Sequence, residues 1–292
     1  MPSLPTTLSL GDRGLGVRAN GTEKTLTAWF VASPVIWKYS MLPSTKGVVD
    51  VVFCLDASGS MAPCIDGVRR NIGAFLDGLV GDRNRNLDCR LDYLAHSCDE
   101  TGNLVRSSSL RLAGLELIEA LYGQKPAPEG FFTTDASELR AGLNNVGAFG
   151  DESMLVALDI CLDYPWRPRE SCHRVVALLT DEPLEANADA KAQQKMIGPL
   201  IDKIHALGVM LFLVGPRSPG FNELAEADKS QFQQIAQAHD GLATLDFARV
   251  LAHIGKSVSV AALQATPDRL VKRALFRQDT WVGSQAEIRG GK

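Results

Sequence analysis

The chain alternates between short, continuous apolar runs and longer stretches in which apolar residues recur every three or four positions. The short runs are rich in β-branched residues and have the length of strands rather than helices. Continuous apolar runs of this kind are typical of parallel strands that are covered by helices on both faces. We predict such strands at residues 48–55, 90–95, 174–179 and 209–214, and a shorter one at 242–246.

The stretches between these runs have helical periodicity. Ile65, Val68, Ile72 and Phe75 show the spacing most clearly. Strands that alternate with helices predict an α/β fold, a Rossmann-like, doubly wound and mostly parallel sheet flanked by helices. We predict helices at 65–79, 154–162, 196–207, 223–238 and 248–263.

Three segments of different character divide the chain. Residues 1–46 contain glycines between short alternating stretches, which predicts a β-rich N-terminal extension. Residues 47–263 carry the α/β pattern, and 264–292 are expected to form a C-terminal helical tail. Within the α/β part, 107–130 is interpreted as an insertion before a strand-like segment at 131–134.

Composition narrows the class of protein. A chain of 292 residues with 45% hydrophobic residues can bury a sizeable core, which predicts a soluble globular protein. Its formal net charge of −4 argues against nucleic acid as a partner, because phosphate binding relies on clustered Lys and Arg. The six cysteines show no C-x-x-C spacing, which indicates free thiols in a reducing compartment. We find no segment typical of a signal peptide or membrane span, and expect a cytoplasmic protein.

Candidate chemistry lies where the predicted strands end. Asp56, Ser58 and Ser60 follow the first strand, and a carboxylate with two hydroxyls at this spacing can face one point in space. Asp181 ends a later strand in the same geometric position, so its carboxylate is expected at the same edge of the sheet. Oxygen donors of this kind suit a hard divalent cation, with Mg²⁺ as the natural candidate.

A third polar loop, Gly150-Asp151-Glu152-Ser153, opens a predicted helix at that edge. Asp151, Glu152 and Ser153 all remain candidates for its ligand, because spacing does not choose among them. A Ser153 hydroxyl would leave a bound cation electrophilic. A carboxylate from Asp151 or Glu152 would add negative charge and favour a structural metal site.

Together, these three motifs resemble the von Willebrand factor A (vWA) family and its metal-ion-dependent adhesion site, over roughly residues 47–262. The resemblance implies a divalent cation (Mg²⁺, or Mn²⁺ or Ca²⁺) that captures an acidic side chain of a protein partner. It implies direct hydroxyl ligation by Ser58 and Ser60, with Asp56 and Asp181 acting largely through coordinated water. Where the family usually supplies a threonine from the middle loop, this chain has Asp151, Glu152 or Ser153.

The expected function is therefore a non-enzymatic, metal-dependent adaptor of the intracellular bacterial type. The resemblance suggests a cytosolic stress or defence system and an ATPase, kinase or phosphatase as partner. The chain contains neither a phosphate-binding G-x-x-x-x-G-K-[ST] string nor a G-x-S-x-G elbow. His96 is expected to be structural rather than catalytic or zinc-binding. The alternatives are a metal-dependent hydrolase and a structural subunit with a vestigial metal site.

Overall fold

The structure is a computed structural model that describes residues 9–11, 14–16, 47–80, 87–98, 104–123, 130–183, 190–227, 229–235 and 246–263. The chain divides into two units, Met1–Met41 and Leu42–Lys292. In the first unit, β1 (Ser9–Gly11) pairs antiparallel with β2 (Gly14–Gly16). The boundaries of the β-rich extension and of the helical tail remain predictions, and 264–292 lie outside the described residues.

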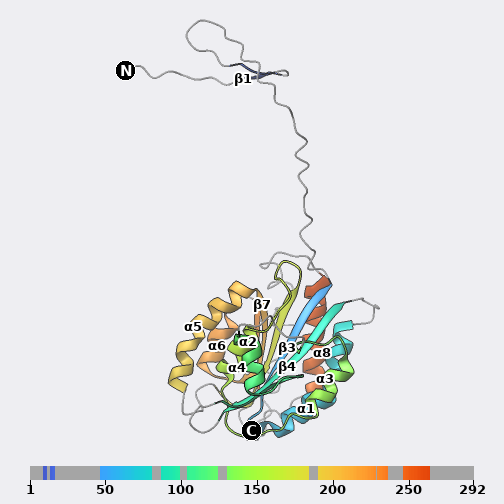
Figure 1. Ribbon diagram of the computed structural model, residues 1–292, viewed down its shortest axis with the longest axis vertical. Coiled ribbons are helices and arrows are strands. Elements are labelled where there is room, and N and C mark those ends of the chain that lie inside the picture. The colour runs from blue at the N-terminus through green and yellow to red at the C-terminus, as the bar shows by residue number, and fades with distance from the viewer. Residues whose placement is uncertain are drawn as a thin grey trace, which may run out of the picture. The chain divides into compact units, whose positions relative to one another are not determined.

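A six-stranded sheet runs through the middle of the second unit, with the strand order β5-β4-β3-β6-β7-β8 (Figure 1). All neighbouring strands pair in parallel except β4 and β5, which are antiparallel. The predicted fold class, a mostly parallel α/β sheet, is confirmed. The strands are β3 (Val48–Asp56), β4 (Asp88–Cys98), β5 (Leu104–Ser109), β6 (His173–Leu179), β7 (Val209–Pro216) and β8 (Ser230–Ile235).

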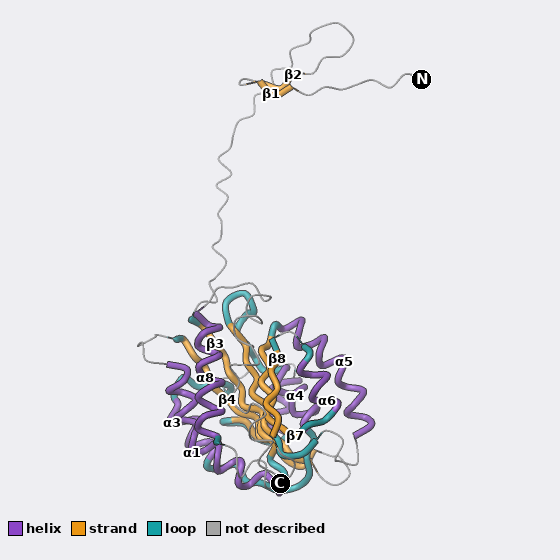
Figure 2. The backbone as a smooth tube through the Cα atoms, turned by 180° about the vertical axis from the view of Figure 1, so that it is seen from behind, coloured by secondary structure: helices purple, strands orange, loops and turns teal. Residues whose placement is uncertain are grey.

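Helices cover both faces of this sheet, as Figures 1 and 2 show from opposite sides. On one face lie α1 (Ala62–Val80), α3 (Ala136–Leu143) and α8 (Phe247–Leu263). On the other face lie α2 (Leu115–Tyr122), α4 (Met154–Leu162), α5 (Ala190–Leu207) and α6 (Pro219–Ala225). None of the helices in the described part of the chain is long and apolar enough to cross a membrane.

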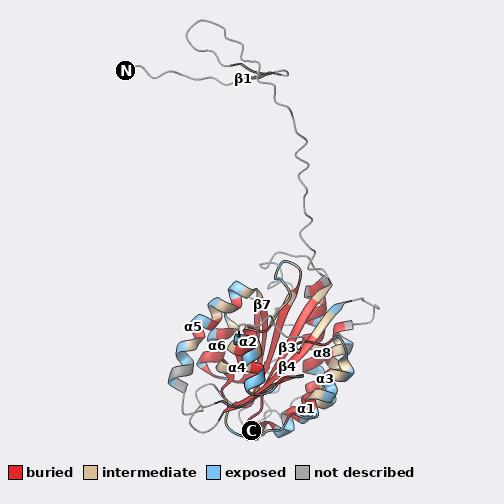
Figure 3. Cartoon of the chain, viewed as in Figure 1, coloured by how far each residue is buried: buried red, intermediate tan, exposed pale blue. Residues whose placement is uncertain are grey.

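Two hydrophobic cores result, because alternate residues of a strand point to opposite faces. Val51, Phe53 and Leu55 of β3 pack with the first helical layer, and Val52 and Cys54 pack with the second. The central strands β3, β6 and β7 are accordingly almost completely buried (Figure 3). This explains why these three strands lack polar alternation in the sequence.

The strand order reverses beside β3. From β3 the chain continues to β4 and β5 on one side, and later returns to β6, β7 and β8 on the other. Ligand sites in open α/β sheets lie at such a switch point, beyond the carboxyl ends of the strands. Asp56 ends β3, and Thr180 and Asp181 follow β6, so they flank this switch point.

Two secondary-structure predictions were wrong. The predicted helix at 223–238 is interrupted, because α6 ends at Ala225 and β8 follows. Lys229 lies between them with a φ of 61°, which no helix accommodates. Ala, Glu and Gln favour a helix there, but pairing with the edge of β7 overrides this preference.

The second error concerns residues 131–134. The segment before it, 107–130, which we interpret as an insertion, contains the end of β5 and the whole of α2. The strand-like segment at 131–134 makes a single bridge, between Thr133 and Leu91. Helix α3 was not predicted, and of the strand predicted at 242–246 only Asp246 is described, outside any strand.

Candidate metal centre

The first turn of the site is folded by the side chain of Asp56. Its Oδ1 accepts a hydrogen bond from the Ser58 backbone N–H at 2.8 Å, which bends the chain as it leaves β3. Its Oδ2 accepts a hydrogen bond from the Thr180 hydroxyl at 2.7 Å. One carboxylate oxygen therefore folds the turn after β3, and the other links that turn to the residue that follows β6.

The two serines of this turn face the second turn. The Ser60 hydroxyl donates to Asp181 Oδ1 at 2.9 Å, across 121 positions of the sequence. Ser58 Oγ and Ser60 Oγ lie 3.2 Å apart, within hydrogen-bond distance. Two hydroxyls and the carboxylate of Asp181 thus converge, as the strand-end motifs predict.

The third turn is fixed to the first by its backbone. The Gly59 N–H donates to the Gly150 carbonyl at 3.1 Å, and Asp151 and Cys98 exchange two backbone hydrogen bonds of 2.8 Å each. Gly150 has a φ of 88°, and a Cβ placed there would lie 2.5 Å from the Cys98 carbonyl oxygen. A glycine is therefore required at this position.

A cavity of about 360 Å³ opens between these turns. Ser153 is not among the residues that line it, and it begins α4 without a capping hydrogen bond from its side chain. Of the three middle-loop candidates, Asp151 and Glu152 line the cavity. The lining residues are Ser58, Gly59, Ser60, Gly150, Asp151, Glu152 and Glu182.

Negative charge is concentrated at this edge. Burial raises the pKa of Asp56 to about 6, hydrogen bonds from Thr180 and Ser58 oppose the rise, and the charge of Asp181 adds to it. Burial also raises the pKa of Glu152 to about 8, together with a hydrogen bond to Asp151 and the charges of Asp56 and Asp151. The carboxylates of the three turns therefore interact electrostatically.

This environment fits a divalent cation. Asp56 and Asp181 are 0% and 1% exposed, and among the described residues neither forms an ion pair. Buried carboxylates are normally paired with a cation or coordinate a metal. The donors present are hydroxyl and carboxylate oxygens, which suit Mg²⁺, Mn²⁺ or Ca²⁺.

The hydroxyls are essential to that donor set. Within the described ranges, no three His, Cys, Asp or Glu side chains form a group that could hold a metal ion. Of the predicted ligands, Asp56, Ser58, Ser60 and Asp181 are brought together, Asp151 lies beside them, and Ser153 is set back. Their role as ligands remains a prediction.

Sequence reasoning assigned no role to two polar residues of the site. Thr180 orients Asp56, and Glu182 lines the cavity. Both flank Asp181 in the sequence, so their closeness to a predicted ligand was an available signal.

His96 lies next to the site but is closed off from it. The side chain is 0% exposed, and its Nδ1 lies 2.7 Å from Ser107 Oγ. Burial lowers the pKa of His96 to about 4, so the imidazole is neutral near pH 7. Its position supports a structural role.

The fold and the site define an α/β domain with a candidate cation site at the carboxyl edge of its sheet. No protein-family model matches the chain, and no curated protein matches it. The chain is similar to solved structures, and the three described below have sequence identities of 13–17% and TM-scores of 0.43–0.46.

One is a von Willebrand factor type A protein from Catenulispora acidiphila, with 17% identity, a TM-score of 0.46, and coverage of 73% of this chain and 43% of that one. Another is proximal thread matrix protein 1 from the mussel byssus with a zinc-occupied MIDAS motif, with 13% identity, a TM-score of 0.43, and coverage of 75% of this chain and 47% of that one. A third is a human COPII-coat protein, with 13% identity, a TM-score of 0.45, and coverage of 75% of this chain and 33% of that one. The matches span less than half of each of these chains.

Proposed function

We propose that this chain is a protein-interaction domain whose binding depends on a divalent cation held at the carboxyl edge of its sheet. The observation that carries the proposal is the convergence of Ser58, Ser60 and Asp181, with Asp56 tied to the same point through Thr180. Two of these side chains are buried carboxylates that form no ion pair among the described residues. A divalent cation would compensate both charges.

The roles of the side chains follow from their chemistry. Ser58 and Ser60 provide neutral oxygens, and Asp56 and Asp181 provide the negative charge that retains a cation. Thr180 holds Asp56 in place by donating to Oδ2. A divalent cation bound there supplies a coordination position that can accept a carboxylate from a protein partner.

The acidic lining makes this binding strictly cation-dependent. Asp151, Glu152 and Glu182 line the cavity beside the two serines. Like charges repel, so an acidic partner is rejected by the cation-free edge. We therefore expect no measurable acid binding when divalent cations are removed.

The order of the three motifs, which resembles the vWA family, supports this proposal. We include in it the finer expectations from that resemblance: Mg²⁺ as the ion, no catalytic turnover, and an adaptor role beside an ATPase, kinase or phosphatase in a bacterial cytosolic system.

Calorimetric titration of the purified chain with Mg²⁺ and Mn²⁺ tests the site. We expect uptake by the wild type and none by a Ser58→Ala, Ser60→Ala double variant. Ser137→Ala, at an exposed position of α3, is the matched control and should bind like the wild type. Absence of uptake by the wild type would refute the proposal.

A second function is favoured by the acidic lining itself. With Asp151, Glu152 and Glu182 around it, a cation is neutralised more fully, and its role would be to hold the three turns together. In that case EDTA lowers the melting temperature while partner binding is unchanged by the double serine variant. In the interaction proposal, the same variant loses the partner.

A further inference from the structure

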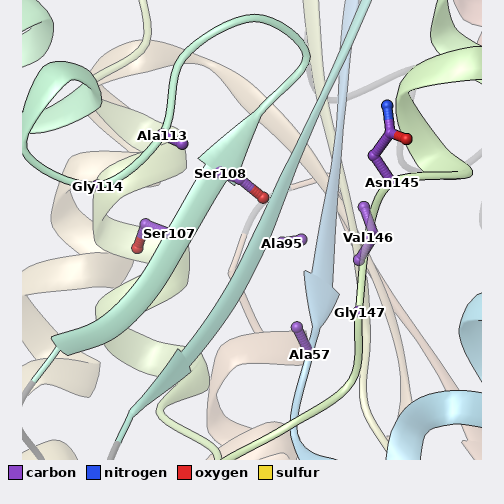
Figure 4. A pocket seen from close by; sticks show the side chains of 9 residues that line it. All are labelled: Ala57, Ala95, Ser107, Ser108, Ala113, Gly114, Asn145, Val146 and Gly147. Carbon is purple, nitrogen blue, oxygen red and sulfur yellow. The ribbon is translucent and has the colours of Figure 1, made fainter.

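A second cavity lies on the other side of the turn that carries the serines. Its volume is about 240 Å³, and it is formed by the ends of β3, β4 and β5 with the loop after α3. Figure 4 shows the side chains of Ala57, Ala95 and Val146 close together, with the Ser108 hydroxyl turned toward Ala95. All of the residues that line it are uncharged.

A ridge of backbone separates the two cavities. Ala57 lines the uncharged cavity and Ser58 the acidic one, and Gly147 and Gly150 are divided in the same way. The two segments are joined by hydrogen bonds from the Phe149 N–H to the Ala57 carbonyl (2.7 Å) and from the Gly59 N–H to the Gly150 carbonyl (3.1 Å). The two cavities therefore lie on opposite sides of two chain segments that are hydrogen-bonded to each other.

The size and chemistry of the second cavity define what fits it. An apolar cavity of roughly 150 Å³ holds a benzene ring, so 240 Å³ accommodates one side chain of the size of Leu, Met or Phe. A charged side chain would lose its hydration there without gaining an oppositely charged partner.

The surroundings favour a protein as the source of that side chain. Of the large apolar side chains that are exposed among the described residues, Leu115 (80%) follows the lining residue Gly114, and Phe149 (48%) belongs to the ridge. Exposed apolar residues beside a cavity are typical of protein-binding surfaces.

We propose that the partner is a linear segment with two anchors, an acidic residue at the cation site and an apolar side chain in this cavity. The inference rests on the proposed function for the first anchor. Because the two cavities lie on either side of one ridge, the two anchors are separated by a constant number of residues along the partner segment.

The test is a library of short displayed peptides with a fixed central glutamate, selected against the purified wild type in Mg²⁺. We expect enrichment of an apolar residue at one constant offset from the glutamate. Gly147→Leu fills the cavity from a position where an added Cβ meets no atom within 4 Å. It should weaken the selected peptides by about tenfold or more, the value of burying one such side chain.

Gln194→Leu, at an exposed position of α5, is the matched control. It should bind the peptides like the wild type. Selected peptides that need Mg²⁺ but bind Gly147→Leu normally would overturn the second anchor and leave the cation function standing.

Peptides that lose affinity for Gly147→Leu but ignore EDTA would overturn the cation function and leave the cavity as a docking site. If the selection enriches no sequence at all, a linear two-anchor partner is ruled out.

Discussion

Asp50 is a buried charge with a structural purpose. Its side chain is fully buried and accepts hydrogen bonds from Arg90 (2.9 and 2.6 Å) and from the backbone and side chain of Arg167 (2.9 and 2.8 Å). Burial alone would raise the pKa of Asp50, but these bonds outweigh it and hold the pKa below 3.8. Asp50 therefore contrasts with Asp56, whose pKa is raised and which has no such partner among the described residues.

We predict that Asp50→Asn lowers the free energy of unfolding at pH 7 by about 3–5 kcal/mol, because two arginines lose a buried counter-charge. A lowered folded-state pKa means that the stabilisation is present above the unfolded value of 3.8 and is lost as the pH falls through the folded value. Urea unfolding between pH 7 and pH 3 should show the two proteins converging at the acid end. A constant difference across that range would contradict the assignment.

Glu152 decides how strongly the cation site attracts an acid. It lines the cavity where the vWA resemblance leads us to expect a hydroxyl. We predict that Glu152→Gln lowers cation affinity and raises the affinity of the cation-loaded site for an acidic peptide, because the variant lacks a carboxyl group that would ionise beside a bound cation. Calorimetry with Mg²⁺, followed by peptide titration in excess Mg²⁺, separates the two effects. If both affinities fall together, Glu152 contacts the partner directly.

At the scale of elements, the middle loop owes its position to Gly150. Its φ of 88° and the nearness of the Cys98 carbonyl leave no room for a side chain. We predict that Gly150→Ala costs about 1–3 kcal/mol of stability, the usual value for a non-glycine residue in such a conformation, and weakens cation binding.

Gly147→Ala, in the same loop, is the control for that experiment. No φ in the left-handed region is recorded there, and an added Cβ meets no atom within 4 Å. Melting temperature and Mg²⁺ titration should both leave it close to the wild type. Equal behaviour of the two variants would show that the loop adapts and that its geometry does not position the site.

The elements that the sequence predicted best are those whose burial is uniform. The strand at 48–55 was recognised because β3 is covered on both faces and tolerates no polar alternation. Strand β8 was missed because its residues favour a helix, and only the neighbouring edge of β7 makes them a strand. The convergence of Ser60 and Asp181 could be predicted because both lie just after the ends of strands. That Ser153 does not line the cavity depends on how α4 begins, which the spacing of residues in the sequence does not reveal.

At the scale of the whole molecule, stability and proposed function are placed at opposite ends of one strand. Asp50 and Asp56 lie six positions apart in β3, about 20 Å at the rise of an extended chain. Arg90 and Arg167 bind Asp50 near the amino end of β3. The carboxylates of the candidate site, which form no ion pair among the described residues, lie at its carboxyl end. A rigid sheet between them would let the edge with the proposed cation site carry unfavourable charge without loss of the fold.

That rigidity depends on how closely α1 and α8 pack on one face of the sheet. A Cβ added to Gly255 of α8 would collide with the Phe75 carbonyl oxygen and lie 2.9 Å from the Leu79 nitrogen of α1. A Cβ on Gly78 of α1 would collide in turn with the Ala252 carbonyl oxygen. The two backbones are therefore in contact at these glycines. A backbone atom cannot move aside by changing rotamer, as a side chain can.

We predict that Gly255→Ala destabilises the domain by about 1–3 kcal/mol through overpacking, although alanine is the better helix former. Gly147→Ala, where an added Cβ meets no atom within 4 Å, should instead stay close to the wild type. Thermal unfolding of the two variants measures the difference. If Gly255→Ala proved as stable as Gly147→Ala, α8 would not lie against α1 as closely as described, and the sheet that aligns the turns after β3 and β6 would lack its support on that face.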